Sequence, residues 1–191
     1  MKIAIIIGSV REGRSSATVA KWVENTAKRT QADVELSVID LYELGLPMFD
    51  EAISPKYNPN RQPEGNVKVW LDALADADGY VIVTPEYNHS IPGSLKNAVD
   101  FVDYQMTKKA AAIVSHGSVG GARAAEHLRN IASELGLVTT PTAVHIVGMI
   151  AMGGVMTEDG ELVNKESGAQ QVLEATLNDL VWYTGALSAA K

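Results

Sequence analysis

Short apolar runs alternate with segments of helical periodicity along most of the chain, and this alternation constrains the fold more than any other feature. Ile3–Ile7, Gly79–Thr84 and Ala110–Val114 are almost continuously apolar, as are strands covered on both faces. Val34–Val38 alternates apolar with polar residues, which indicates a half-buried strand. A fifth strand is predicted within Leu137–Val147.

Helical spacing of apolar residues fills most intervals between these runs. The helices are predicted around Val19–Ala27, Val67–Ala77, Leu95–Val102, Leu128–Leu135 and Leu173–Leu187. Two places depart from the pattern. Pro141 cannot donate a ladder hydrogen bond, so the fifth strand should lie at a sheet edge or carry a bulge. The stretch from Asp40 to Gly65 is broken by prolines and predicts a long loop that is functional or mobile.

Strands that alternate with helices and are apolar throughout predict an α/β fold, with a parallel sheet between two layers of helices. Five strands favour the flavodoxin-like three-layer sandwich, with strand order 2-1-3-4-5. The 191 residues have the length of one domain. We therefore expect residues 1–191 to form a single domain.

Composition excludes several functional classes. Sixteen basic residues against twenty-three acidic ones give a net charge of −7, which argues against nucleic acid or an anionic membrane as partner. No apolar stretch approaches the roughly 20 residues that span a bilayer. The chain has no cysteine, which removes thiolate metal ligands and fits a reducing, cytoplasmic location. Its four histidines are scattered, so no metal site is predicted.

In such a fold the ligand lies beyond the carboxyl ends of the strands. The first loop there, Gly8–Thr18, precedes a helix and is rich in hydroxyls, with two arginines, Arg11 and Arg14. The free N–H groups of a helix N-terminus and nearby arginines attract a phosphate. The alternative is that a serine caps the helix while both arginines are solvated.

Two further loops reach the same edge. Thr84–Gly93 is stiffened by prolines, and Tyr87 beside Asn88 offers an aromatic face next to amide groups, which suits a flat heterocycle. A rigid turn with Tyr87 in the core would have the same sequence. Ser115–Gly121 is glycine-rich and allows close approach of backbone to a ligand.

These loops together resemble the NADPH-dependent FMN reductase family, which includes bacterial quinone and chromate reductases and is flavodoxin-like. The resemblance extends over roughly Ile3 to Val147. The residues that carry it are Gly8-Ser9 with Arg11, Leu46-Pro47 with Asp50-Glu51, Thr84-Pro85-Glu86-Tyr87-Asn88 followed by Ser90, Pro92-Gly93, Leu95-Lys96-Asn97-Ala98 and Asp100, and Ser115, Gly117, Gly120-Gly121 and Arg123.

The resemblance implies an FMN cofactor and NADPH or NADH as co-substrate. It implies that Ser9, Arg11 and Ser16 hold the phosphate, with Arg14 at a position where relatives often have serine. Pro85, Glu86, Tyr87 and Asn88 would line the flavin ring, and Ser115, Gly117 and Gly120 would close its other side. Relatives usually form homo-oligomers, as a dimer or a dimer of dimers.

The implied reaction is ping-pong transfer of a hydride from NAD(P)H to FMN and then of electrons to a quinone, free flavin or other small acceptor. The cofactor carries this chemistry, so no catalytic acid or base is nominated. A non-enzymatic electron carrier of flavodoxin type is the main alternative, since the same fold serves both functions. A domain that has lost its flavin is a further one. A serine hydrolase built on Ser118 is disfavoured, because His116 stands where the nucleophile elbow needs glycine.

Overall fold

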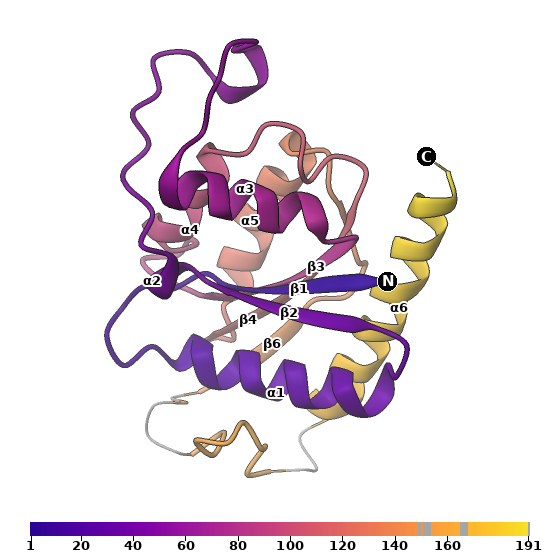
Figure 1. Ribbon diagram of the computed structural model, residues 1–191. Coiled ribbons are helices and arrows are strands. Elements are labelled where there is room, and N and C mark those ends of the chain that lie inside the picture. The colour runs from indigo at the N-terminus through magenta and orange to yellow at the C-terminus, as the bar shows by residue number, and fades with distance from the viewer. Residues whose placement is uncertain (149, 151–153, 165–167, 191) are drawn as a thin grey trace.

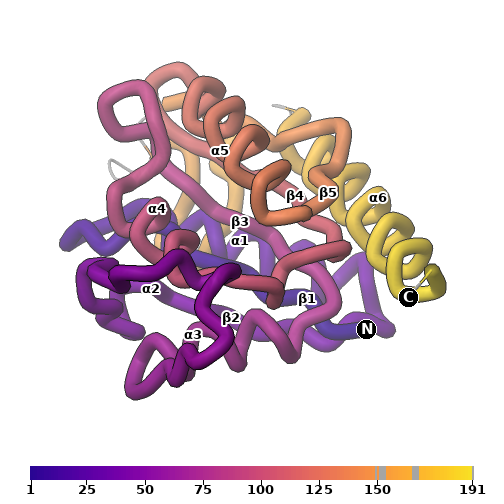
Figure 2. The backbone as a smooth tube through the Cα atoms, turned by 90° about the horizontal axis from the view of Figure 1, so that it is seen from above, coloured from indigo at the N-terminus to yellow at the C-terminus, as the bar shows by residue number. Residues whose placement is uncertain are grey.

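The computed structural model describes residues 1–148, 150, 154–164 and 168–190. In it, a parallel sheet carries helices on both faces (Figure 1). The strands lie in the order β2-β1-β3-β4 (Figure 2). Both β5 and β6 pair with β4. This arrangement confirms the predicted flavodoxin-like α/β fold. The strands are β1 (Lys2–Ile7), β2 (Glu35–Asp40), β3 (Gly79–Pro85), β4 (Ala110–Gly117), β5 (Val138–Thr139) and β6 (Val144–Val147).

The fifth position of the sheet is divided between two short strands, where the sequence predicted one. Pro141 lies between β5 and β6, at the edge that its missing N–H requires. The guanidinium of Arg129 donates hydrogen bonds to the carbonyls of Thr140 (2.8 Å) and Pro141 (3.0 Å). It thereby satisfies backbone oxygens at the interruption, and the edge placement predicted from Pro141 is confirmed.

Two apolar cores lie on opposite faces of the sheet because successive strand residues point to opposite sides. On β1, Ile3 and Ile5 pack on one face, and Ala4 and Ile6 on the other. Helices α3, α4 and α5 cover one face and α1 and α6 the other (Figure 1). Within the described residues, none of the helices combines the length and apolarity needed to cross a bilayer. The helices are α1 (Ser15–Thr30), α3 (Gly65–Asp76), α4 (Gly93–Asp100), α5 (Ala122–Glu134) and α6 (Ala169–Ala189).

The segment from Asp40 to Gly65 is more ordered than its prolines predicted. It contains α2 (Leu41–Leu44) and the 3-10 helix η1 (Pro55–Tyr57). Arg61, whose side chain is only 6% exposed, pairs with Glu51 (2.7 Å) and Asp103 (3.1 Å). The pair with Glu51 lies within the segment, and the pair with Asp103 attaches its far end to the chain that follows α4.

Candidate functional site

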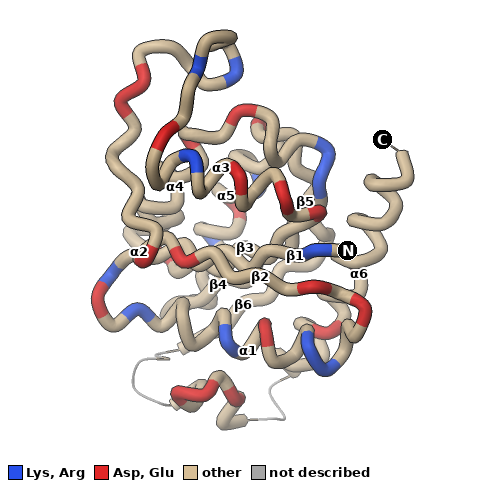
Figure 3. The backbone as a smooth tube through the Cα atoms, in the orientation of Figure 1, with Lys and Arg blue, Asp and Glu red and all other residues tan. Residues whose placement is uncertain are grey.

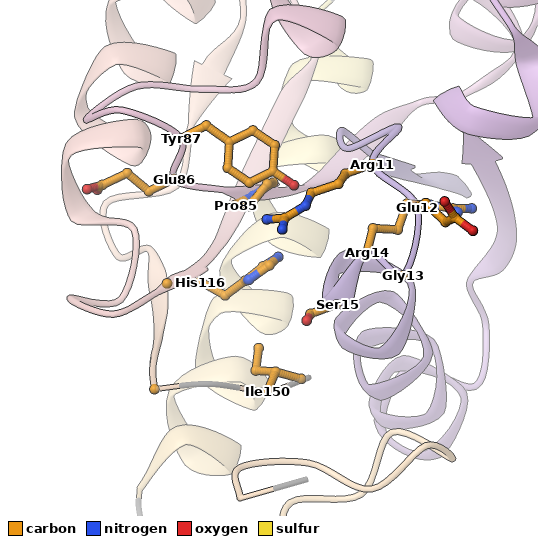
Figure 4. Close-up of a pocket in the computed structure, with 12 residues that line it drawn as sticks. Arg11, Glu12, Gly13, Arg14, Ser15, Pro85, Glu86, Tyr87, His116 and Ile150 are labelled. Carbon is orange, nitrogen blue, oxygen red and sulfur yellow. The ribbon is translucent and has the colours of Figure 1, made fainter. Parts of the chain in front are cut away.

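The loops after β1, β3 and β4 meet at one edge of the sheet and enclose a pocket of about 310 Å³ (Figure 4). Pockets of a few hundred Å³ hold small molecules and cofactors. Six of the predicted site residues line it, together with six residues that were not predicted as ligands. The lining residues are Arg11, Glu12, Gly13, Arg14, Ser15, Pro85, Glu86, Tyr87, His116, Gly117, Gly148 and Ile150.

The first loop delivers the N-terminus of α1 to this pocket. Arg14 occupies the N-cap position and makes no capping hydrogen bond through its side chain, and the first turn contains no acidic residue. The backbone N–H groups there consequently have no side-chain acceptor in the described part of the chain, and the helix dipole favours an anion. Figure 4 shows Arg11 and Ser15 directed into the pocket. This donor set fits a phosphate group.

Arg14 differs from Arg11 in how its charge is used. Its guanidinium forms an ion pair with Asp40 and lies 4.3 Å from the centre of the Tyr42 ring. The loop thus carries basic, acidic and basic residues in turn (Figure 3), with the charge of Arg14 already compensated. A direct contact between Arg14 and the phosphate stays a prediction.

Two predicted phosphate ligands, Ser9 and Ser16, are fully buried and bonded to aromatic side chains. The Ser9 hydroxyl lies 2.8 Å from the Tyr87 hydroxyl, and the Ser16 hydroxyl lies 2.8 Å from Nε2 of His116. These pairs tie the first loop to the loops after β3 and β4. Neither side chain lines the pocket, and their role as phosphate ligands stays a prediction.

The loop after β3 presents Pro85, Glu86 and Tyr87 to the pocket. Tyr87 and Ser90 exchange backbone hydrogen bonds of 2.9 and 3.1 Å, which close a tight turn through Asn88. The Glu86 carboxylate accepts hydrogen bonds from the Arg123 side chain and backbone N–H, and these lower the pKa of Glu86. Its charge is therefore satisfied by α5. Asn88 is not among the lining residues.

The loop after β4 is shaped by a buried serine and two glycines. The Ser115 hydroxyl donates to the Gly120 carbonyl (2.7 Å), so it accepts from Nδ1 of His145 (2.8 Å). Gly120 and Gly121 both have positive φ, 77° and 72°. Of the predicted residues here, Gly117 lines the pocket, whereas Ser115 and Gly120 hold the loop behind it.

His116 is one of the lining residues that were not predicted as ligands; the others are Glu12, Gly13, Ser15, Gly148 and Ile150. His116 ends β4 beside Gly117, is nearly buried, and has its pKa lowered to about 4 by that burial. The scatter of the four histidines along the sequence predicts no metal site, but it carries no information about contact with an organic ligand. The signal that could have found His116 is its position, since it opens a loop already assigned to the ligand edge.

Residues 1–151 match the sequence pattern that defines the NADPH-dependent FMN reductase family. The chain belongs to this family. This reductase is 37% identical over 141 residues to NAD(P)H-dependent FMN reductase from Schizosaccharomyces pombe, covering 74% of this chain and 70% of the relative. It is 31% identical over 175 residues to quinone reductase from Escherichia coli K12, covering 86% of each.

The fold of the reductase also matches solved structures. FerB from Paracoccus denitrificans, described as a flavoenzyme NAD(P)H:(acceptor) oxidoreductase, superposes with a TM-score of 0.72 at 23% identity, over 95% of this chain and 98% of FerB. Family membership confirms the prediction of an NAD(P)H-dependent oxidoreductase that uses FMN, as opposed to a non-enzymatic carrier.

Proposed function

We propose that the pocket holds FMN with its phosphate at the N-terminus of α1 and its ring against the loops after β3 and β4. The acceptor of the reductase is then a quinone or another small molecule that reaches the exposed ring. The observation that carries this proposal is the uncapped start of α1, with Arg11 beside it, opening into the same pocket as Pro85–Tyr87. When bound, FMN supplies the redox chemistry by accepting a hydride from NAD(P)H and passing electrons on.

In this proposal the residues of the chain bind FMN and orient its ring. Arg11 and the N–H groups of α1 neutralise the phosphate. The β3 loop gives a rigid wall for the ring, because the Tyr87–Ser90 turn and the Glu86–Arg123 pair hold it from both sides. The Ser9–Tyr87 hydrogen bond joins the loop proposed to bind the phosphate to the loop proposed to contact the flavin ring. No side chain has to move a proton for the electrons to be transferred.

Anaerobic mixing of the FMN-reconstituted protein with excess NADPH, followed at the flavin absorbance, tests this function. We expect rapid bleaching that added quinone reverses. Flavin that binds tightly and stays oxidised would instead indicate an electron carrier supplied by another protein. Absence of flavin binding would refute the proposal altogether. Repeating the experiment with NADH determines the preference between the two nucleotides.

Substitution of Arg11 by alanine should weaken FMN affinity by roughly ten- to hundredfold, because a charge-assisted contact contributes about 1.5–3 kcal/mol. The dissociation constant is measured by quenching of flavin fluorescence. Arg29→Ala is the matched control, since Arg29 lies at the far end of α1 and the same charge is lost. Equal FMN affinity in the Arg11→Ala variant and the wild type would show that Arg11 does not bind the phosphate.

We infer a cytoplasmic homodimer as the working form. An apolar surface next to the flavin pocket supports the dimer: it is hollowed beside Val10, Tyr42 and Met48, and all three side chains are exposed. The absence of cysteine supports a reducing compartment. Sedimentation equilibrium should give twice the chain mass for the wild type and less for Met48→Asp. A wild type that sediments as a monomer would contradict the dimer.

A further inference from the structure

His116 occupies a distinctive place in the pocket, between the elements that flank it. It is the last residue but one of β4, paired in register with Pro85 on β3. Its Nε2 lies 2.8 Å from the hydroxyl of Ser16 in the first turn of α1. Figure 4 shows the imidazole directed across the pocket toward Arg11 and Ser15. One side chain therefore connects the phosphate end of the pocket to its ring end.

The order of groups in FMN determines what lies against this position. The phosphate and the flavin ring are joined by the ribityl chain, a run of hydroxyl-bearing carbons. With the phosphate at α1 and the ring at Pro85–Tyr87, that chain passes between them. We propose that His116 binds the ribityl hydroxyls of FMN and that Ser16 positions its imidazole for this contact. The inference rests on the proposed function and adds a residue to its site.

The chemistry of the imidazole suits a polyol. Burial lowers the pKa of His116 to about 4, so the ring is neutral near pH 7 and carries one donor nitrogen and one acceptor nitrogen. A hydroxyl can pair with either. The hydrogen bond to Ser16 is the one recorded for this ring within the described chain, and it engages Nε2 only. The rest of the polar capacity of the imidazole remains for a ligand at the pocket wall.

Burial also explains why Ser16 is proposed to position the imidazole of His116. The Ser16 side chain is fully buried and does not line the pocket, so its effect on the ribityl chain would be exerted through His116. The backbone of His116 is held separately, because its carbonyl accepts from the N–H of Glu86 (3.1 Å). The main chain and the ring tip are each held by a hydrogen bond, which limits the rotamers open to the side chain. Such preorganisation favours binding because less entropy is lost when the ligand arrives.

Three flavins that contain different segments of the cofactor show which segment a side chain contacts. FMN has ring, ribityl chain and phosphate; riboflavin lacks the phosphate; lumiflavin lacks the phosphate and the chain. We would measure the affinity of each by fluorescence quenching for the wild type, His116→Phe and the double variant Ser16→Ala/His116→Phe. Phenylalanine keeps an aromatic ring but removes both nitrogens. The double variant also removes the serine hydroxyl that the single variant leaves buried without a partner.

We expect FMN and riboflavin affinities to fall by the same factor, about five- to tenfold for one lost hydrogen bond, while lumiflavin affinity stays within about twofold. Ser16→Ala alone should give a smaller fall of the same kind. Arg11→Ala provides the reference pattern, a loss confined to FMN. If the His116 variants lose only FMN affinity, lose all three equally or lose none, the inference is wrong. A wild type that binds none of the flavins would instead refute the proposed function itself.

Discussion

Replacing Gly121 by alanine should lower the free energy of unfolding by about 2–5 kcal/mol and abolish measurable FMN binding. Gly121 has a φ of 72°, a left-handed conformation that costs a residue with a Cβ about 1–2 kcal/mol. The added Cβ would also lie 2.9 Å from the backbone nitrogen of His116 and 2.9 Å from Cβ of Ser115. Both neighbours belong to β4, so the clash cannot be relieved by turning a side chain.

The loss of FMN follows from the same contacts. To admit the Cβ, the end of β4 must move relative to the loop after it, and His116 and Gly117 line the pocket at that point. Urea unfolding gives the stability and flavin quenching the affinity. Gly168→Ala is the matched control, because Gly168 has a φ of 75°, but among the described residues beyond its chain neighbours no atom lies within 4 Å of an added Cβ. If the two variants lose the same stability, backbone strain alone accounts for Gly121.

The sheet was predictable because its information is local. Ile3–Ile7 and Ala110–Val114 are apolar on every residue, and each residue of a strand covered on both faces meets a core. The division of the last strand into β5 and β6 was predictable only in part. Pro141 predicts a break in the ladder, but the return of the chain to β4 as β6 is not visible in the sequence, nor are the hydrogen bonds from Arg129 of α5 to Thr140 and Pro141.

The site was predictable as a set of loops and less so as a set of side-chain partners. The edge of the sheet follows from topology, and Arg11 lines the pocket at that edge. The partners of Ser9 and Ser16 are Tyr87 and His116, 78 and 100 residues away. No pattern within one loop states such a pairing, since it arises only when β1, β3 and β4 lie side by side. The ion pair between Arg14 and Asp40 at the end of β2 is not visible in the sequence for the same reason.

The stability of the flavin-free protein should depend on pH through His116. The folded protein holds the pKa of this group at about 4 against an ordinary value of 6.5, because burial disfavours the charged imidazole. Above pH 6.5 the ring is neutral in both states and contributes no pH dependence. As the pH falls from 6.5 toward 4, the unfolded chain binds a proton that the folded chain does not, so stability is lost. Below pH 4 both states are protonated and this loss stops growing.

The size of the effect follows from the shift. A difference of this magnitude corresponds to about 3 kcal/mol over the whole window, most of it already lost by about pH 4.5. Urea unfolding of the flavin-free protein across this range should therefore show a steeper decline for the wild type than for Ser16→Ala/His116→Phe, which has no group to titrate at this position. Carboxylates contribute to both curves, so the difference between them isolates the histidine. Parallel curves would mean that His116 accepts its proton in the folded protein as readily as in the unfolded one, and that burial does not lower its pKa.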